Sequence, residues 1–356
     1  MNGAAPTSVC LLRTSALGDV THVVPLLRTL QDRLPQARLS WIIGVPEHKL
    51  LGDIEGVDFI VHDKRRGLAG WRALHRDLQG RRFDVLLHMQ VAMRANVLSR
   101  AVPAGRRIGY DRARSKDLHG LFVNERIAAH PRQHVLDAIG SFAEPLGVQR
   151  EAVRWDIPVP AEARDWALAQ WPEDGQPTLL LSPCSSHALR NWRAERYAAV
   201  ADHAVRRLKM RVVLTGGRSA VERAMGDAIL ANMQAPALDL IGKDTLKQAL
   251  ALYQRAAIVL TPDSGPMHMA NAMGAPVLGL HAATNPGRSG PYSDRRWCVD
   301  RYDDAARRYL GRPAADLHWG TRIQRPGVMD LIGIGEVIER LEAFVAAGPG
   351  AAAQRR

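Results

Sequence analysis

The residues best suited to carry chemistry lie in a short stretch, Asp263–Pro266 (DSGP), separated by two residues from the apolar run 256–260. Asp and Ser cap free N–H groups, Gly permits a tight turn and Pro suits a first helical turn, so this order predicts a helix start. A helix N-terminus at the carboxyl end of a strand offers N–H groups and a favourable dipole to an anion, typically a phosphate. An ordinary capped turn would have the same pattern.

A second candidate group is the carboxylate of Asp19, in the small-residue turn 14–19 that follows a predicted strand, Ser8–Arg13. Gly18 beside it would let the backbone approach a ligand closely. The carboxylate could cap the following helix, or it could act as a general base. The turn lacks both G-x-G-x-x-G and G-x-x-x-x-G-K-[ST], so it is neither a dinucleotide fingerprint nor a P-loop.

Polar and small residues also follow two other predicted strands of the second half, 178–182 and 211–215. Hydroxyls, glycines and a cation, gathered on one sheet edge with a helix N-terminus, would suit a phosphorylated nucleotide. Each position could also be purely structural. The residues concerned are Ser185, Ser186, Arg190, Gly216 and Gly217.

In the first half, a polar loop with three cations (Arg112, Arg114 and Lys116) follows a predicted strand, 106–110. It is either a solvated loop or a loop that grips an anionic substrate. The stretch 89–94, which ends at Arg94, follows the predicted strand 83–88 and could face the same edge.

The elements that must position these residues alternate between strands and helices in both halves, which predicts an α/β fold with parallel sheets. Further strands are expected at 39–44, 57–62, 237–241 and 276–281, and helices at 20–34, 71–78, 134–146, 194–208, 219–233, 245–255 and 337–345, with a short helix around 161–171. Five Pro or Gly residues between 158 and 177 break the pattern. We therefore expect an N-terminal domain 1–160, a linker 161–177, a C-terminal domain 178–346 and a disordered tail 347–356.

Composition narrows the class of protein. The 356-residue chain is 46% hydrophobic, and its three cysteines have neither metal-ligand spacing nor a disulfide pattern. We find no secretory signal and no apolar run of the roughly 20 residues that cross a bilayer, so a cytoplasmic protein is expected. The net charge is +12, and residues 62–154 hold eighteen Lys or Arg against nine Asp or Glu. An anionic partner is therefore expected, but no nucleic-acid-binding motif is present.

Two pieces of the chain, TSALGDVTHVVPLL (Thr14–Leu27) and TPDSGPMHMANAMGAPVLGL with the later TNPGRSGPY, resemble the family 9 glycosyltransferases. These heptosyltransferases build the inner core of lipopolysaccharide, and the resemblance spans about Val9 to Phe344. It implies a GT-B fold, in which two Rossmann-like doubly wound domains face each other across a cleft. The N-terminal domain would bind the acceptor and the C-terminal domain the nucleotide sugar, which the resemblance implies to be ADP-heptose. It also implies inverting transfer without a metal or other cofactor.

Residue by residue, the resemblance makes Asp19 the catalytic base. It places the donor's phosphates at Ser264, Gly265, Pro266 and His268, with Asp263 beside them. Arg190, two residues before Trp192, stands where the family has Lys, and Ser185 and Ser186 take the place of small hydroxyl residues. The donor set is completed by Gly216 and Gly217. The acceptor set is Gly18, His22, Arg94, Arg112, Arg114 and Lys116.

Several readings stay open at this point. The Lys-to-Arg change and the altered stretch 282–284 leave the donor sugar and base undetermined. The alternatives are a glycosyltransferase that uses another nucleotide sugar, a nucleotide-sugar epimerase and a non-catalytic sugar-nucleotide binder. Asp19 is the residue that would distinguish an enzyme from the non-catalytic binder. The expected partners are a nucleotide sugar and an anionic lipid-linked saccharide. The protein is expected to be a monomer that contacts the acidic inner-membrane surface peripherally.

Overall fold

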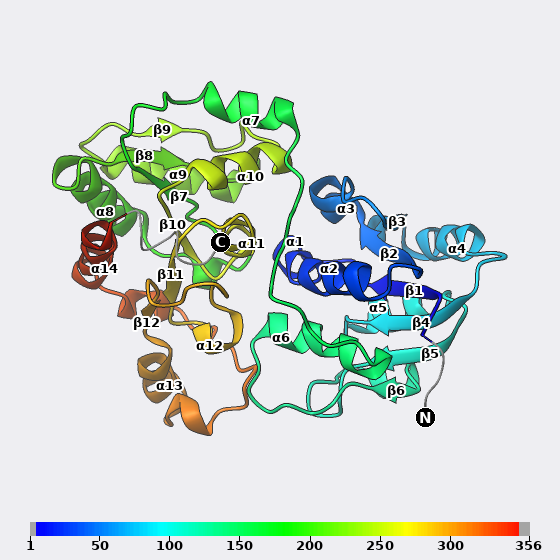
Figure 1. The fold of residues 1–356 in the computed structure, drawn as a ribbon. Coiled ribbons are helices and arrows are strands. Elements are labelled where there is room, and N and C mark those ends of the chain that lie inside the picture. The colour runs from blue at the N-terminus through cyan, green and yellow to red at the C-terminus, as the bar shows by residue number, and fades with distance from the viewer. Residues whose placement is uncertain (1–4, 349–356) are drawn as a thin grey trace. The chain divides into compact units, whose positions relative to one another are not determined.

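The computed structural model describes residues 5–348 and divides the chain into two compact units, Met1–Pro158 and Val159–Arg356 (Figure 1). Each unit is an α/β domain built around one parallel sheet. The expected disordered tail, 347–356, lies outside the described residues except for its first two positions.

The sheet of the first unit has six parallel strands in the order β3-β2-β1-β4-β5-β6. The register pairs Leu12 of β1 with Ile42 of β2 and with His88 of β4, so these strands end at the same edge. Strand order reverses between β1 and β4, and ligands of open α/β sheets bind outside the carboxyl ends of the strands at such a reversal. The bounds are β1 Ser8–Leu12, β2 Arg38–Gly44, β3 Asp58–His62, β4 Phe83–His88, β5 Ala104–Gly109 and β6 Glu125–Arg126.

The helices of the first unit divide more often than the sequence pattern predicts. In the helical stretch expected over 20–34, Pro25 is predicted to interrupt the helix or to start its regular part; the structure has two helices there, with Pro25 in the first turn of the second one, where its missing N–H is not needed. The helix expected over 134–146 continues as a 3₁₀ helix, with Pro145 inside it. The bounds are α1 Leu17–Thr21, α2 Val24–Arg33, α3 Val45–Leu51, η1 Lys64–Arg66, α4 Gly67–Asp77, α5 Met93–Ser99, η2 His119–Leu121, α6 Val135–Gly140 and η3 Ser141–Leu146.

A buried apolar cluster holds α4 and α5 on one face of this sheet. It joins Leu74 of α4 and Leu98 of α5 to Cys10 and Leu12 of β1, all of which are nearly or fully inaccessible. Every residue of β1 is buried, as expected for a central strand covered on both faces. The core therefore fixes the end of β1, from which the Asp19 turn begins.

The second unit repeats the same topology. Its six parallel strands have the order β12-β11-β10-β7-β8-β9, so the first and fourth strands of the unit, β7 and β10, are again neighbours at the reversal. The bounds are β7 Thr178–Leu181, β8 Arg211–Leu214, β9 Leu238–Asp239, β10 Ile258–Pro262, β11 Val277–His281 and β12 Val299–Asp300.

The helices of this unit include two that the sequence did not place. α13 and η5 lie in the stretch 300–328, where the sequence predicts no helix or strand; the buried residues of α13 are Tyr302, Ala305 and Ala306, and the two alanines give only a weak apolar signal. The bounds are α7 Ala161–Leu168, η4 Ala188–Arg190, α8 Ala194–Arg206, α9 Ala220–Asn232, α10 Leu246–Arg255, α11 Gly265–Ala272, α12 Pro286–Ser289, α13 Tyr302–Leu310, η5 Ala314–Asp316, η6 Val328–Leu331 and α14 Ile334–Ala347.

Residues 161–177, expected as a linker, belong to the second unit. Arg255 of α10 donates hydrogen bonds to the carbonyls of Ala167 and Trp171, and its guanidinium lies 4.3 Å from the centroid of the Trp171 ring. The prolines therefore interrupt the helical pattern without detaching the segment. None of the described helices, within residues 5–348, is both long and apolar enough to cross a membrane.

Candidate functional site

Asp19 lies at the sheet reversal of the first unit, in the first turn of α1. Its Oδ2 accepts a hydrogen bond from the Ala16 amide at 3.1 Å and lies 2.7 Å from a guanidinium nitrogen of Arg13. The Asp19 side chain is still 43% exposed. The carboxylate therefore closes its own turn and remains accessible to a substrate.

Arg13, which sequence reasoning missed, is fixed by backbone carbonyls on both sides of the reversal. Its Nε donates to the Ser15 carbonyl at 2.9 Å and one terminal nitrogen donates to the Met89 carbonyl at 2.5 Å, after β4. Burial alone would lower the pKa of Arg13, but the charge of Asp19 outweighs it and the pKa is raised. Arg13 therefore stays cationic and orients Asp19.

Gln90 completes this arrangement from the loop after β4. Its side-chain oxygen accepts bonds from the Thr14 amide (2.9 Å) and hydroxyl (3.0 Å), and its side-chain nitrogen donates to the Ser15 hydroxyl at 3.2 Å. The signal that could have found Gln90 is a polar residue just beyond a buried strand.

A second carboxyl group, Glu47 in the first turn of α3, lies behind the Asp19 turn. It is 3% exposed, and its Oε2 has no hydrogen-bond partner among the described residues. Burial raises the pKa of Glu47, and the charge of Asp19 adds to the rise. A Cβ on Gly44 would lie within 2.3 Å of both Glu47 and the Thr14 carbonyl, so only glycine allows this packing.

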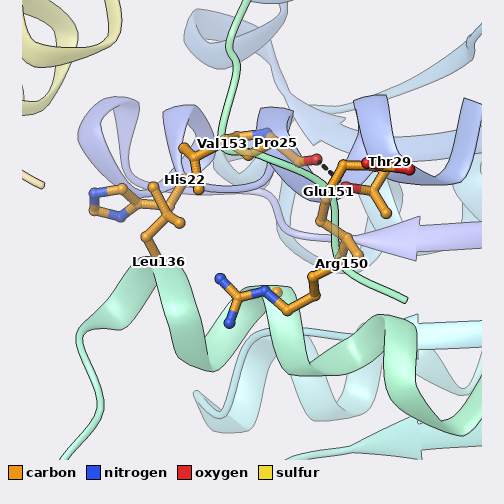
Figure 2. Close-up of a pocket in the computed structure, with 9 residues that line it drawn as sticks. His22, Pro25, Thr29, Leu136, Arg150, Glu151 and Val153 are labelled. Atoms are coloured by element: carbon orange, nitrogen blue, oxygen red, sulfur yellow. Dashed lines mark hydrogen bonds between the residues drawn. The ribbon is translucent and has the colours of Figure 1, made fainter. Parts of the chain in front are cut away.

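The other residues predicted near Asp19 have structural surroundings. Gly18 accepts a hydrogen bond from the Thr21 hydroxyl through its carbonyl, at 2.7 Å. His22 is buried, with its ring edge-on to His134 at 5.8 Å between centroids. His22 also lines a small hollow, shown in Figure 2, whose other labelled residues are Pro25, Thr29, Leu136, Arg150, Glu151 and Val153.

The four cations predicted to bind the acceptor divide into two kinds. Arg94, Arg112 and Lys116 are exposed. Arg114 is held by its own unit: it pairs with Asp111, donates to Gln133 at 2.5 Å and to the Ala128 carbonyl at 2.7 Å, and packs over Tyr110. Arg114 is thus held by residues of its own unit, and its assignment to the acceptor stays a prediction.

At the reversal of the second unit, Arg190 lies against Asp263. A terminal nitrogen of Arg190, at the end of η4 after β7, is 3.5 Å from both the carbonyl and a carboxylate oxygen of Asp263, which follows β10. Both side chains are about nine-tenths buried. The pair bridges the two loops that flank the reversal.

Asp263 is the centre of a charged cluster. His268 Nε2 lies 3.7 Å from one of its carboxylate oxygens, and the Ser289 hydroxyl donates to the other at 3.3 Å. Burial alone would raise the pKa of Asp263, but His268, His281 and Arg190 outweigh burial and hold that pKa well below its usual value. Asp263 is therefore ionised, and it keeps Arg190 in place.

The N-terminus of α11 starts beside this cluster. Ser264 is the N-cap residue, but its hydroxyl pairs with the Thr261 hydroxyl at 3.0 Å and makes no capping bond to the helix. Gly265 and Pro266 form the first turn, and His268 is the fourth helical residue. The helix dipole and the first amides are thus directed at the sheet edge where Arg190 lies.

The remaining predicted donor residues differ in burial and in their hydrogen-bond partners. Ser185 is buried, and its amide donates to Asn191 at 2.7 Å, whereas Ser186 is exposed. The Gly217 amide, beside Gly216 after β8, donates to the Glu222 carboxylate at 2.7 Å. The Gly217 amide therefore holds a carboxylate of its own chain, and the assignment of Gly216 and Gly217 to the donor stays a prediction.

Glu222 is a functional candidate that sequence reasoning missed. It also accepts a bond from the Ser219 hydroxyl at 2.7 Å. Nearby Asp244, after β9, has its pKa raised to about 6 by burial and by the Glu222 charge. Across residues 5–348 there is no cluster of three or more His, Cys, Asp or Glu side chains arranged to hold a metal ion.

Two parallel-sheet units of identical strand order, each with polar groups at the reversal, form a two-domain α/β fold of the GT-B type. The glycosyltransferase family 9 (heptosyltransferase) model matches residues 71–314. The chain belongs to this family and is a glycosyltransferase of the heptosyltransferase kind.

Curated relatives agree. The chain is 36% identical to the lipopolysaccharide core heptosyltransferase OpsX of Haemophilus influenzae over 339 residues, which cover 95% of this chain and 97% of OpsX. It is 25% identical to lipopolysaccharide heptosyltransferase 1 of Pseudomonas aeruginosa, over 80% of this chain and 81% of the relative.

Solved structures show the same fold. A family 9 glycosyltransferase from Veillonella parvula matches with a TM-score of 0.80 and 22% identity, over 96% of this chain and 98% of that one. The E. coli heptosyltransferase WaaC, solved with ADP, matches with a TM-score of 0.71 and 18% identity, over 95% and 99%.

Proposed function

We propose that this heptosyltransferase moves a heptose from ADP-heptose to an anionic saccharide of the lipopolysaccharide inner core, with inversion at C1 and without a metal. The observation that carries the proposal is the pair of sheet reversals: an accessible carboxylate fixed by Arg13 at one, and a buried cation beside a helix N-terminus at the other. WaaC has been solved with ADP and with ADP-2-deoxy-2-fluoro heptose, which supports the choice of donor.

The donor's diphosphate is assigned to Arg190 and the N-terminus of α11. A guanidinium can bind phosphate oxygens through two parallel bonds, and the helix amides add neutral donors to the same charge. Ser185 and Ser186 are the nearby hydroxyl groups of the loop after β7. Gly216 and Gly217 remain predicted donor residues, although the Gly217 amide already binds the Glu222 carboxylate.

In the transfer step, Asp19 accepts the proton of the acceptor hydroxyl as its oxygen attacks C1 of the heptose. The bond between C1 and that oxygen forms on the face opposite the diphosphate while the bond from C1 to the diphosphate breaks, so the configuration inverts. ADP leaves with additional negative charge, which Arg190 and the α11 amides stabilise. The proton ends on Asp19.

The acceptor is assigned to the exposed cations of the first unit. Arg94, Arg112 and Lys116 are available to carboxylates or phosphates of an inner-core saccharide, and Gly18 and His22 border the base. Because such an acceptor is lipid-linked, we also propose that the protein contacts the acidic inner-membrane surface peripherally.

The proposal is tested by offering the purified chain several nucleotide sugars. We expect ADP-heptose, and not UDP- or GDP-sugars, to raise the melting temperature and to support transfer to an inner-core saccharide. Transfer should survive excess EDTA. A preference for another nucleotide would contradict the assigned donor, and activity abolished by EDTA and restored by magnesium or manganese would contradict metal-independent transfer.

A further inference from the structure

Large apolar side chains are exposed on one part of the first unit. Leu68 of α4 is 77% exposed, Leu121 of η2 is 72% exposed and Leu118, just before η2, is 64% exposed. Val97 and Met93 of α5 are 48% and 40% exposed. Single exposed apolar residues are ordinary on protein surfaces, but a group on neighbouring elements indicates an interaction site.

Hydrogen bonds show that these elements adjoin one another. The Trp71 indole of α4 donates to the Val97 carbonyl of α5 at 3.4 Å. The Asn96 side chain of α5 donates to the Asp117 carbonyl at 2.7 Å, and the Met93 amide donates to the Asp117 carboxylate at 3.1 Å. The exposed residues therefore belong to one surface, the α4–α5–η2 face, made of Leu68, Met93, Val97, Leu118 and Leu121.

The backbone that presents the leucines of η2 has an unusual conformation. Asp117 and Leu118 have φ of 53° and 58°, in the left-handed region that glycine favours. A bulky residue rarely adopts this conformation, so the surrounding contacts must impose it. The two bonds from α5 to Asp117 are such contacts. The fold thus uses a strained segment to hold Leu118 away from the core.

Exposed cations lie on the same segments as the apolar residues. On α4, Arg72 lies one turn after Leu68, and Arg65 and Arg66 precede it; on α5, Arg94 and Arg100 lie three residues before and after Val97. Segments 63–77, 91–100 and 111–121 together contain ten Lys or Arg, four Asp and no Glu. Asp63 is paired with Arg65, Asp111 with Arg114, and Asp117 binds an amide. The face is therefore strongly positive around an apolar centre.

The position of the face in the first unit is also informative. Leu68, Met93 and Leu118 follow β3, β4 and β5, so they lie toward the carboxyl ends of the parallel strands, the edge at which Asp19 lies. A surface that touched a lipid layer here would bring the base close to a substrate anchored in that layer.

We infer that the α4–α5–η2 face docks on the surface of a bilayer that contains anionic lipid, with Leu68, Leu118 and Leu121 inserted between headgroups. Exposed leucines with exposed arginines on the same segments match the chemistry of such a surface, in which apolar side chains enter the acyl boundary and cations remain with the phosphates. The inference deepens the proposed function, since it supplies the means by which a lipid-linked acceptor is approached.

The test uses the full chain and vesicles without saccharide or nucleotide sugar, so its outcome does not depend on transfer. Wild-type protein should co-sediment with phosphatidylcholine vesicles that contain 30% phosphatidylglycerol. Its affinity for vesicles of phosphatidylcholine alone should be about a hundred-fold lower. Changing Arg65, Arg66 and Arg72 to Gln should weaken binding by about a hundred-fold, because each lost charge lowers the affinity by about five-fold and the three factors multiply.

The apolar part is tested by Leu68→Gln, Leu118→Asn and Leu121→Gln together, where Asn suits the left-handed backbone. Binding should fall at least ten-fold at an unchanged melting temperature. The matched control is Leu168→Gln in α7, 44% exposed in the other unit, which should bind as wild type. Equal loss in the control, or equal binding to neutral and anionic vesicles, would overturn the inference.

Insertion itself can be read from a probe, because all three native cysteines are buried. A polarity-sensitive dye on Leu121→Cys should shift to the blue with anionic vesicles, and the same dye on Leu168→Cys should not. No shift at position 121 would overturn the inference. The inference would also be overturned if the protein bound no vesicles but self-associated in sedimentation, and the leucine substitutions abolished that self-association. The face would then contact a second copy of the chain. Vesicle binding without heptose transfer would instead contradict the proposed function alone.

Discussion

The guanidinium of Arg13 lies 2.7 Å from the carboxylate of Asp19, and it is itself held by the Ser15 and Met89 carbonyls. The bond from Arg13 to the Met89 carbonyl crosses the point between β1 and β4 at which the strand order of the first sheet reverses. A cation fixed by backbone carbonyls cannot follow a mobile side chain, so it restricts the orientations that Asp19 can take. This relationship leads to two predictions.

The first prediction concerns the base. Asp19→Asn keeps an oxygen that can accept from the Ala16 amide, so the turn should persist. Turnover should fall by roughly 10²- to 10⁴-fold, the usual contribution of general-base catalysis. The shift in melting temperature caused by ADP should be unchanged, because the donor is assigned to the other unit. Near-normal turnover in the Asn variant would mean that Asp19 only closes the turn.

The second prediction concerns the orientation of the base. Arg13→Lys keeps the positive charge but loses the planar fork that joins Ser15, Met89 and Asp19. We expect kcat to fall about ten-fold while the donor KM stays the same. In Arg13→Met the acidic limb of the pH–rate profile should also move to higher pH, because the cation that favours ionised Asp19 is gone.

A suitable control for this pair is Arg33→Met. Arg33 is also paired with a carboxylate, that of Glu151, but on an exposed surface. Its loss should leave both kcat and the profile unchanged. If Arg13→Met and Arg33→Met behaved alike, Arg13 would have no role in orienting the base.

The sequence identified functional carboxylates in the turns that follow buried strands. It did not identify side chains whose role depends on a contact with a distant part of the chain. Asp19 and Asp263 stand in small-residue turns after buried runs, where a carboxylate is conspicuous. Arg13 closes the first strand itself, and a cation there looks like an ordinary strand terminus. Its role depends on the Met89 carbonyl, 76 residues away, which periodicity cannot bring near.

The same limit explains Gly217 and Arg114. Two glycines after a strand fit a phosphate, but α9 brings Glu222 back onto the Gly217 amide, so the site holds an internal carboxylate. Arg114 sits in a polar loop like Arg112, yet Gln133 and Ala128 bind it from a later segment. The two sheets, by contrast, were predictable because buried strands and amphipathic helices alternate locally.

The third prediction tests Arg190 at the donor site. A charge-assisted hydrogen bond contributes about 1.5–3 kcal/mol, so Arg190→Ala should weaken ADP binding by roughly ten- to a hundred-fold. Arg190→Lys keeps the charge and should lose less. Calorimetry with ADP alone measures this directly. Arg193→Ala, which removes a nearby exposed arginine paired with Asp330, is the control and should bind ADP normally.

The fourth prediction concerns acid stability. His88 and His119 both bind the Asn96 side-chain oxygen, at 3.0 and 2.8 Å. Burial, together with the neighbouring charges, lowers the pKa of His88 to about 3 and that of His119 to about 4. A lowered pKa in the folded state stabilises the protein above the unfolded value of about 6.5. That contribution is lost as the pH falls from about 6.5 toward 3.

His88→Gln can still donate to Asn96, and it has no proton to gain. Between pH 7 and pH 4, we expect the free energy of unfolding of wild type to fall by about 2–3 kcal/mol more than that of the variant. Urea unfolding at both pH values measures the difference. His130→Gln, at an exposed histidine, should follow wild type. Parallel curves for His88→Gln and wild type would show that His88 does not govern acid stability.

The last prediction separates the two kinds of cation in the loop after β5, using a water-soluble inner-core saccharide so that membrane docking plays no part. Arg112 and Lys116 are exposed, and cations along a binding surface concentrate an oppositely charged substrate. Arg112→Ala with Lys116→Ala should therefore raise the acceptor KM several-fold, while the donor KM stays within about two-fold. The wild-type acceptor KM should also rise with salt, because screening shortens to about 8 Å at physiological ionic strength.

Arg114→Ala should instead lower the melting temperature, since its bonds to Asp111, Gln133 and Ala128 are internal. The matched double variant Arg206→Ala with Arg207→Ala removes two exposed cations at the end of α8 and should leave both KM values unchanged. A salt-insensitive acceptor KM, or an equal effect of the two double variants, would contradict an acceptor bound through its negative charge.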